Sequence, residues 1–172
     1  MITTTYRKFL QTKNSMRVLG IDPGTERLGF AIVEKFSGSE TLLEAGLIST
    51  KIKDANGKRL LYIQEELGKV LERNEIDLAG VEKIFFSKNV STAIRVAEAR
   101  GVVLALLAKH NIPIREYAPT EIKSATVGYG NATKDQVSKM VQTILRLASP
   151  LTPDDVADAA AIALTTISRE KF

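Results

Sequence analysis

The hydrophobic pattern of the first fifty residues is that of β-strands. Residues 17–22, with the sequence RVLGID, form a short apolar run that leads into a glycine-containing turn, as expected of a buried strand. Residues 28–35 and 40–51 alternate apolar and polar side chains closely enough to predict two more strands. Three strands in succession predict an antiparallel meander.

Beyond residue 55, helical and extended patterns alternate. Residues 57–74 carry apolar side chains three or four positions apart, which predicts an amphipathic helix. The mostly apolar segment 77–85 predicts a central strand that is covered on both faces. A mostly apolar helix at about 91–109 and a fifth strand at 112–118 are expected to follow.

The C-terminal third of the chain is predicted to be helical. A short helix is expected from about Pro119, and a longer one near 133–147 with Thr133 as its N-cap. The last helix is expected to be capped by Thr152, with Pro153 at its first position and acids in its first turn. The element order predicts an α/β fold with a mixed five-stranded sheet and helices on both faces.

Size and composition narrow the class of protein. A chain of 172 residues suits one domain, and no apolar run approaches the roughly 20 residues of a membrane-spanning helix. The chain has no cysteine and one histidine, which excludes disulfide scaffolds, thiolate zinc sites and cysteine nucleophiles. Any bound metal must therefore have oxygen ligands, which favours hard cations such as Mg²⁺ or Mn²⁺.

The net charge of +4 is unevenly distributed along the chain. Ten basic and four acidic residues lie between Lys83 and Arg146. A basic stretch of this kind suits a partner that carries phosphate groups, because neutralised phosphates release counterions. Solvated helix faces are the simpler explanation.

The first 16 residues are basic, rich in threonine and free of acidic residues. They lack the apolar centre of a secretory signal, so we expect a flexible extension before a single folded domain at 17–172. An upstream start codon, with Met16 as the first residue of the compact domain, and an organelle transit peptide are alternatives.

Four acidic residues stand at positions that suggest a site. Asp22 follows the first strand, and Glu82 interrupts the apolar fourth strand. Asp155 and Asp158 are three residues apart, so they share one face of the last helix. Three of them have a simpler explanation when taken alone, namely a turn for Asp22, a neighbouring lysine for Glu82, and the helix dipole for Asp155. The dipole explains Asp158 less well, because this residue lies farther from the helix start.

Taken together, the four carboxylates predict a metal centre. If the first and fourth strands are neighbours, Asp22 and Glu82 converge, and the last helix can deliver the other two acids. Carboxylates crowded in this way repel one another unless cations lie between them. Two divalent cations bound there could act on the attacking water and the leaving oxygen of a phosphodiester.

The segments around these acids resemble the RuvC family of Holliday-junction resolvases. The matching segments, in order, are LGIDPGTERLGFAIVE, GVEKIFFSKN, EARGVV and DDVADAAAIALT, and the resemblance spans about residues 17–168. It implies an RNase H-like fold and a cytoplasmic homodimer. It also implies paired nicks at four-way DNA junctions during recombination and repair. The resemblance further implies that cleavage depends on Mg²⁺ or Mn²⁺, with two ions per active site, and that a branch-migration motor is a partner.

The resemblance also assigns residues. The family's metal-binding and catalytic acids correspond to Asp22, Glu82, Asp155 and Asp158. Some members carry a histidine at the position of Asp155, so the adjacent Asp154 is an alternative ligand. The residues expected to bind DNA are Phe85, Asn89, Arg100, Lys123 and Lys134.

Three other functions fit parts of the sequence. A glycine loop near Asp22 also occurs in ATP-dependent kinases, but these generally need a second lobe for which this chain has no room. Another RNase H-like nuclease, acting on RNA:DNA hybrids, would share the same acids. A junction-binding protein without nuclease activity would not need all four.

Overall fold

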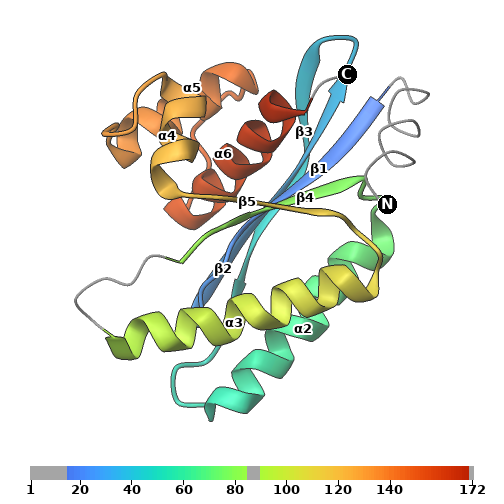
Figure 1. The fold of residues 1–172 in the computed structure, drawn as a ribbon, viewed down its shortest axis with the longest axis vertical. Coiled ribbons are helices and arrows are strands. Elements are labelled where there is room, and N and C mark those ends of the chain that lie inside the picture. Colours follow the sequence, from blue (N-terminus) through green and yellow to red (C-terminus); the bar gives the residue numbers. More distant parts are fainter. Residues whose placement is uncertain (1–14, 85–89, 171–172) are drawn as a thin grey trace.

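The computed structural model describes residues 15–84 and 90–170. A five-stranded sheet has the order β3-β2-β1-β4-β5 (Figure 1). Its strands are β1 (Ser15–Asp22), β2 (Arg27–Phe36), β3 (Ser39–Ser49), β4 (Leu78–Glu82) and β5 (Ile114–Tyr117). Its helices are α2 (Asn56–Arg73), α3 (Val90–Lys109), α4 (Pro119–Val127), α5 (Lys134–Ile144) and α6 (Asp154–Arg169). The predicted α/β class, mixed sheet and element order are confirmed.

Strand pairing brings together the two strands that end in Asp22 and Glu82. The first three strands form the antiparallel meander, whereas β1–β4 and β4–β5 are parallel. The β1–β4 register pairs Val18 with Leu78 and Ile21 with Val81. The next residues along the two strands are Asp22 and Glu82, so both carboxylates lie at the same edge of the sheet.

The two faces of the sheet are covered by different helices (Figure 1). Because side chains alternate along a strand, Val18 packs with residues of α4, α5 and α6, whereas Leu19 and Ile21 pack with α2 and α3. Both hydrophobic clusters consist of residues that are almost fully buried. In the parts of the chain described above, no helix is both long and apolar enough to cross a bilayer.

Helix α6 lies unusually close to the sheet. A Cβ atom added to Gly20 would stand 2.0 Å from the carbonyl oxygen of Ala159, and one added to Gly29 would stand 2.0 Å from that of Asp155. Both separations are far below any real contact. Glycine in β1 and β2 and alanine in α6 therefore fix how near the helix start can lie to the sheet.

Several predicted boundaries change by a few residues. Strand β1 begins at Ser15 and Met16 is fully buried, so the fold begins before residue 17. Strand β4 ends at Glu82 instead of continuing to residue 85. Thr133 caps α5 as predicted. The predicted Thr152 cap is wrong, because α6 begins at Asp154 and Pro153 occupies the N-cap position. We attribute this shift to packing of α6 on the sheet, which overrides a local capping preference.

Candidate active site

Three of the four predicted acids line one cavity. Asp22 ends β1, Glu82 ends β4, and Asp158 lies in the second turn of α6. The cavity has a volume of about 330 Å³ and is also lined by residues of α4 and α5. Its lining consists of Asp22, Glu82, Pro119, Ile122, Lys123, Lys134, Val137, Asp158 and Ile162.

The carboxylates in this cavity repel one another. Burial, followed by the charges of Glu82, Asp158 and Asp155, raises the pKa of Asp22 to about 7. Burial and the charge of Asp158 also raise the pKa of Glu82, and Lys134 and Lys123 partly offset this. A site of this kind favours any cation that can enter it, because a cation relieves both the repulsion and the cost of burial.

The ammonium group of Lys134, on α5, provides one positive charge at this site. Its ammonium nitrogen lies 2.9 Å from Asp158 Oδ2 and 3.0 Å from Asp154 Oδ2. Hydrogen bonds to these two carboxylates raise the pKa of Lys134, so it stays charged at neutral pH. The lysine side chain is two-thirds exposed, and it bridges the start of α5 to the start of α6.

Asp155 and Asp154 have different surroundings although they are neighbours. Asp155 is largely buried, and its charge contributes to the raised pKa of Asp22. Its Oδ2 atom lies 3.0 Å from Arg27 Nη2 but accepts no hydrogen bond. Asp154 is about half exposed and pairs with Arg27 and Lys134. Of the two, Asp155 is therefore the one whose charge acts on Asp22, whereas Asp154 contacts the cavity only through Lys134.

The residues present suit a hard divalent cation. Among the residues placed in the structure, no three acidic or histidine side chains stand close enough together, in their present rotamers, to hold one ion. Lys134 already lies against Asp158, and Asp155 Oδ2 has no hydrogen-bond donor. Carboxylate oxygens are the donors that Mg²⁺ and Mn²⁺ prefer. Release of Lys134 from Asp158 would leave those oxygens free to ligate an ion.

The predicted DNA-binding residues are placed unequally. Lys123 and Lys134 line the cavity. Arg100 Nε donates to the carbonyl oxygen of Glu82 at 3.2 Å, and the same guanidinium pairs with Glu116. These contacts join α3 to β4 and β5, so Arg100 supports the strand end that carries Glu82. Phe85 and Asn89 lie outside the described residues, and DNA binding by all five residues stays a prediction.

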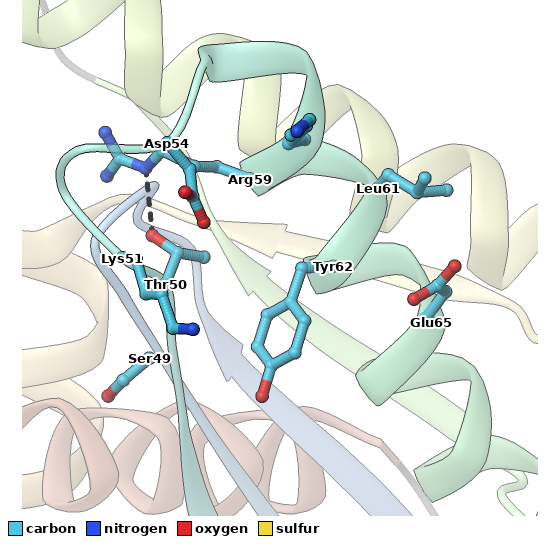
Figure 2. Close-up of a pocket in the computed structure, with 9 residues that line it drawn as sticks. Ser49, Thr50, Lys51, Asp54, Arg59, Leu61, Tyr62 and Glu65 are labelled. Atoms are coloured by element: carbon cyan, nitrogen blue, oxygen red, sulfur yellow. Dashed lines mark hydrogen bonds between the residues drawn. The ribbon is translucent and has the colours of Figure 1, made fainter.

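The sequence did not predict which residues support the turn after Asp22. Figure 2 shows Arg59, on α2, reaching Thr50 at the end of β3. Arg59 Nε donates to Thr50 Oγ1 at 2.9 Å, and Thr50 Oγ1 donates to the carbonyl oxygen of Thr25 at 2.6 Å. The backbone N–H of Thr50 also donates to the carbonyl oxygen of Glu26 at 3.0 Å. The buried arginine and Thr50 therefore hold the β1–β2 turn in place.

Arg27 was also missed. It begins β2 and pairs with both acids at the start of α6, but nothing in its local sequence indicates these contacts. The contacts depend on how closely α6 packs against β2 at Gly29. Only the assembled fold reveals this kind of partner.

The comparisons with known proteins agree with one another. Residues 18–166 match the family described as crossover junction endodeoxyribonuclease RuvC. Relatives of that name from Petrotoga mobilis and Chloroflexus aggregans are 48% and 46% identical, over 86% and 87% of this chain and 91% of each relative. A solved structure of Thermus thermophilus RuvC in complex with Holliday junction substrate has a TM-score of 0.82 and 35% identity, covering 87% of this chain and 92% of that one. The yeast mitochondrial Holliday junction resolvase, at 13% identity and a TM-score of 0.61, shares the fold.

Proposed function

Since the chain belongs to the RuvC family of crossover junction endodeoxyribonucleases and is a Holliday junction resolvase, we propose that its nuclease chemistry is centred on Asp22, Glu82, Asp155 and Asp158. The observation that carries this proposal is the convergence of Asp22, Glu82 and Asp158 on one cavity, where burial and mutual repulsion raise the pKa of Asp22 to about 7. Such a cluster is unfavourable without a cation.

Divalent-metal dependence follows from family membership, and we propose Mg²⁺, with Mn²⁺ as a substitute and two ions per site. Asp22, Glu82 and Asp158 would hold them, and Asp155 would complete the set once it leaves Arg27. A bound divalent cation would supply an activated water and charge stabilisation for in-line attack on a phosphodiester. No covalent link between enzyme and DNA is needed.

The residues of the chain itself supply binding and orientation. Lys123 and Lys134 present positive charge at the cavity, where they can contact the phosphates of a bound strand. Asp22 must be ionised to act as a ligand, and a neighbouring positive charge favours its ionised form. The turn after Asp22 is held by Thr50 and Arg59, which limits movement of the Asp22 carboxylate.

We also propose that two copies assemble through the surface of α2 and α3. A four-way junction has approximate two-fold symmetry, so a two-fold dimer presents one active site to each of two opposed strands. A groove of about 470 Å³ lies between these helices. It is lined by Leu60, Gln64, Glu98, Gly101, Val102, Ala105, Leu106 and Lys109. Contact with a branch-migration motor stays an expectation from the family resemblance.

The site is tested by cleavage of a synthetic four-way junction with and without Mg²⁺, with linear duplex as the comparison substrate. Asp22→Asn is expected to lose more than about 100-fold in cleavage rate, since changes to residues that only support metal ligands already cost about 10- to 100-fold. Asp135→Asn is the matched control, because this exposed acid on α5 forms an ion pair with Lys139 and does not line the cavity. Undiminished cleavage by the Asp22→Asn protein would remove Asp22 from the mechanism.

A further inference from the structure

Two cations from different elements meet at Asp154. Arg27, at the start of β2, places Nη2 3.4 Å from Asp154 Oδ1. Lys134, at the start of α5, places Nζ 3.0 Å from Asp154 Oδ2. The same lysine nitrogen lies 2.9 Å from Asp158 Oδ2, so Asp154 and Asp158 share one ammonium group.

The helix dipole does not account for these contacts. An acid in the first turn of α6 is favourable wherever its side chain points. The Asp154 carboxylate instead faces two basic residues and uses one oxygen for each.

Lys134 and a divalent cation compete for the same acid. Asp158 lines the cavity with Asp22 and Glu82, and the Lys134 ammonium now occupies one of its oxygens. A cation that takes Asp158 must displace this ammonium. With Asp154 present, the displaced lysine keeps a carboxylate partner at the rim of the cavity, whereas without Asp154 it would lose its last partner among these acids.

We propose that Asp154 is a positioning residue that retains Lys134 at the rim of the cavity when a divalent cation takes Asp158. This inference rests on the proposed function, because it assumes that Asp158 is a metal ligand. Asp154 then has two effects. It eases displacement of Lys134 from Asp158, and it keeps the ammonium beside the cavity, where a DNA phosphate would lie.

The test measures Mn²⁺ affinity of the full chain without DNA, by following free Mn²⁺ through its electron paramagnetic resonance signal. Asp154→Asn is expected to weaken Mn²⁺ binding about three- to fivefold, in keeping with the strength of an exposed ion pair. Asp154→Glu, which keeps a carboxylate, is expected to restore the affinity to within about twofold. Asp135→Asn removes an equal charge from the same region and is expected to leave the affinity unchanged.

The decisive comparison repeats Asp154→Asn in a Lys134→Met background. If Asp154 acts through Lys134, its removal there changes Mn²⁺ affinity by less than about twofold. An equal loss in both backgrounds would overturn the proposal, since Asp154 would then act as a ligand or through its charge alone. No loss in the Lys134-containing protein, or an equal loss in Asp135→Asn, would also overturn it.

Failure of the proposed function has a separate signature in the same assay. Asp22→Asn is expected to abolish most Mn²⁺ binding whatever Asp154 does. Unchanged binding by Asp22→Asn would contradict the metal centre itself. Intact dependence on Asp22 without a Lys134-dependent effect of Asp154 would contradict only the positioning role.

Discussion

At the scale of single residues, the cluster of acids in the candidate site is electrostatically unfavourable. Burial and the negative charges of three other carboxylates disfavour the ionised form of Asp22 and raise its pKa to about 7. Lys134 relieves part of the repulsion, but it also occupies Asp158. The clustered carboxylates therefore lower the free energy of unfolding unless a cation neutralises them, as is common at functional sites.

This electrostatic cost predicts how stability depends on pH. The folded-state pKa of Asp22 is raised, so the folded protein holds the Asp22 proton more tightly than the unfolded chain does. Ionisation of Asp22 therefore lowers the free energy of unfolding as pH rises from about 4 to about 7. The shift from 3.8 to about 7 corresponds to roughly 4 kcal/mol. Asp22→Asn removes this effect and is expected to be more stable than the natural sequence at pH 8 in the presence of a chelator.

Chemical denaturation of both proteins at pH 4 and pH 8 measures the difference. It should be below about 1 kcal/mol at pH 4, where Asp22 is protonated in the folded state and about half ionised in the unfolded chain, and several kcal/mol at pH 8. Excess Mn²⁺ should reverse the order at pH 8, because only the protein with Asp22 gains the full binding energy. A difference that does not vary with pH would contradict the account of Asp22.

At the scale of elements, the position of α6 decides the geometry of the site. The helix carries Asp155 and Asp158, and its distance from the sheet is set by glycines in β1 and β2. Gly29 is the critical residue, because it pairs with Asp22 in the β1–β2 register and contacts the backbone of Asp155. One glycine therefore controls the separation between two of the proposed ligands.

Gly29→Ala is expected to move the start of α6 away from the sheet. The added Cβ would lie 2.0 Å from the carbonyl oxygen of Asp155, so the helix must shift, at a cost of about 1–3 kcal/mol. Mn²⁺ affinity and junction cleavage should both fall. Gly68→Ala is the control, since nothing lies within 4 Å of its added Cβ and this helix position should gain about 0.5–1 kcal/mol. Full Mn²⁺ affinity in Gly29→Ala would show that α6 tolerates the shift.

The sequence predicts the elements better than the contacts between them. Hydrophobic periods together with proline and helix-capping residues predict every strand and helix of the described chain, and the parallel pairing of β1 with β4 brings Asp22 and Glu82 together as expected. The contacts of Arg27 and Asp154 were not predicted, because they depend on the depth at which α6 packs. Thr50 and Arg59 were missed for a similar reason, since their hydrogen bonds join residues whose proximity only the fold creates.

At the scale of the whole molecule, the two sides of the sheet have different roles. Helices α4, α5 and α6 surround the candidate site on one side, and α2 and α3 cover the other (Figure 1). Helix α3 buries Val103 and Leu107 in the core, yet Ile94 is half exposed and Ala105 lies at the groove surface. If the proposed dimer forms through this surface, which lies away from the candidate site, the cavity would stay open to DNA.

The proposed dimer predicts that Ala105→Glu yields a monomer that still folds. Ala105 is exposed in the single chain, so glutamate there costs the fold little, whereas a charge buried between two copies is strongly unfavourable. Sedimentation should change from about twice the chain mass of 18.8 kDa to that mass. The thermal unfolding temperature in dilute solution and the Mn²⁺ affinity should stay close to those of the natural sequence, which would show that the fold and the site are intact. Paired cuts of a junction should give way to single nicks, because each molecule then carries one active site. Thr143→Glu places the same charge on an exposed position of α5, across the sheet, and should remain dimeric. Ala105→Glu protein that sediments as a dimer would assign the contact between copies to another surface.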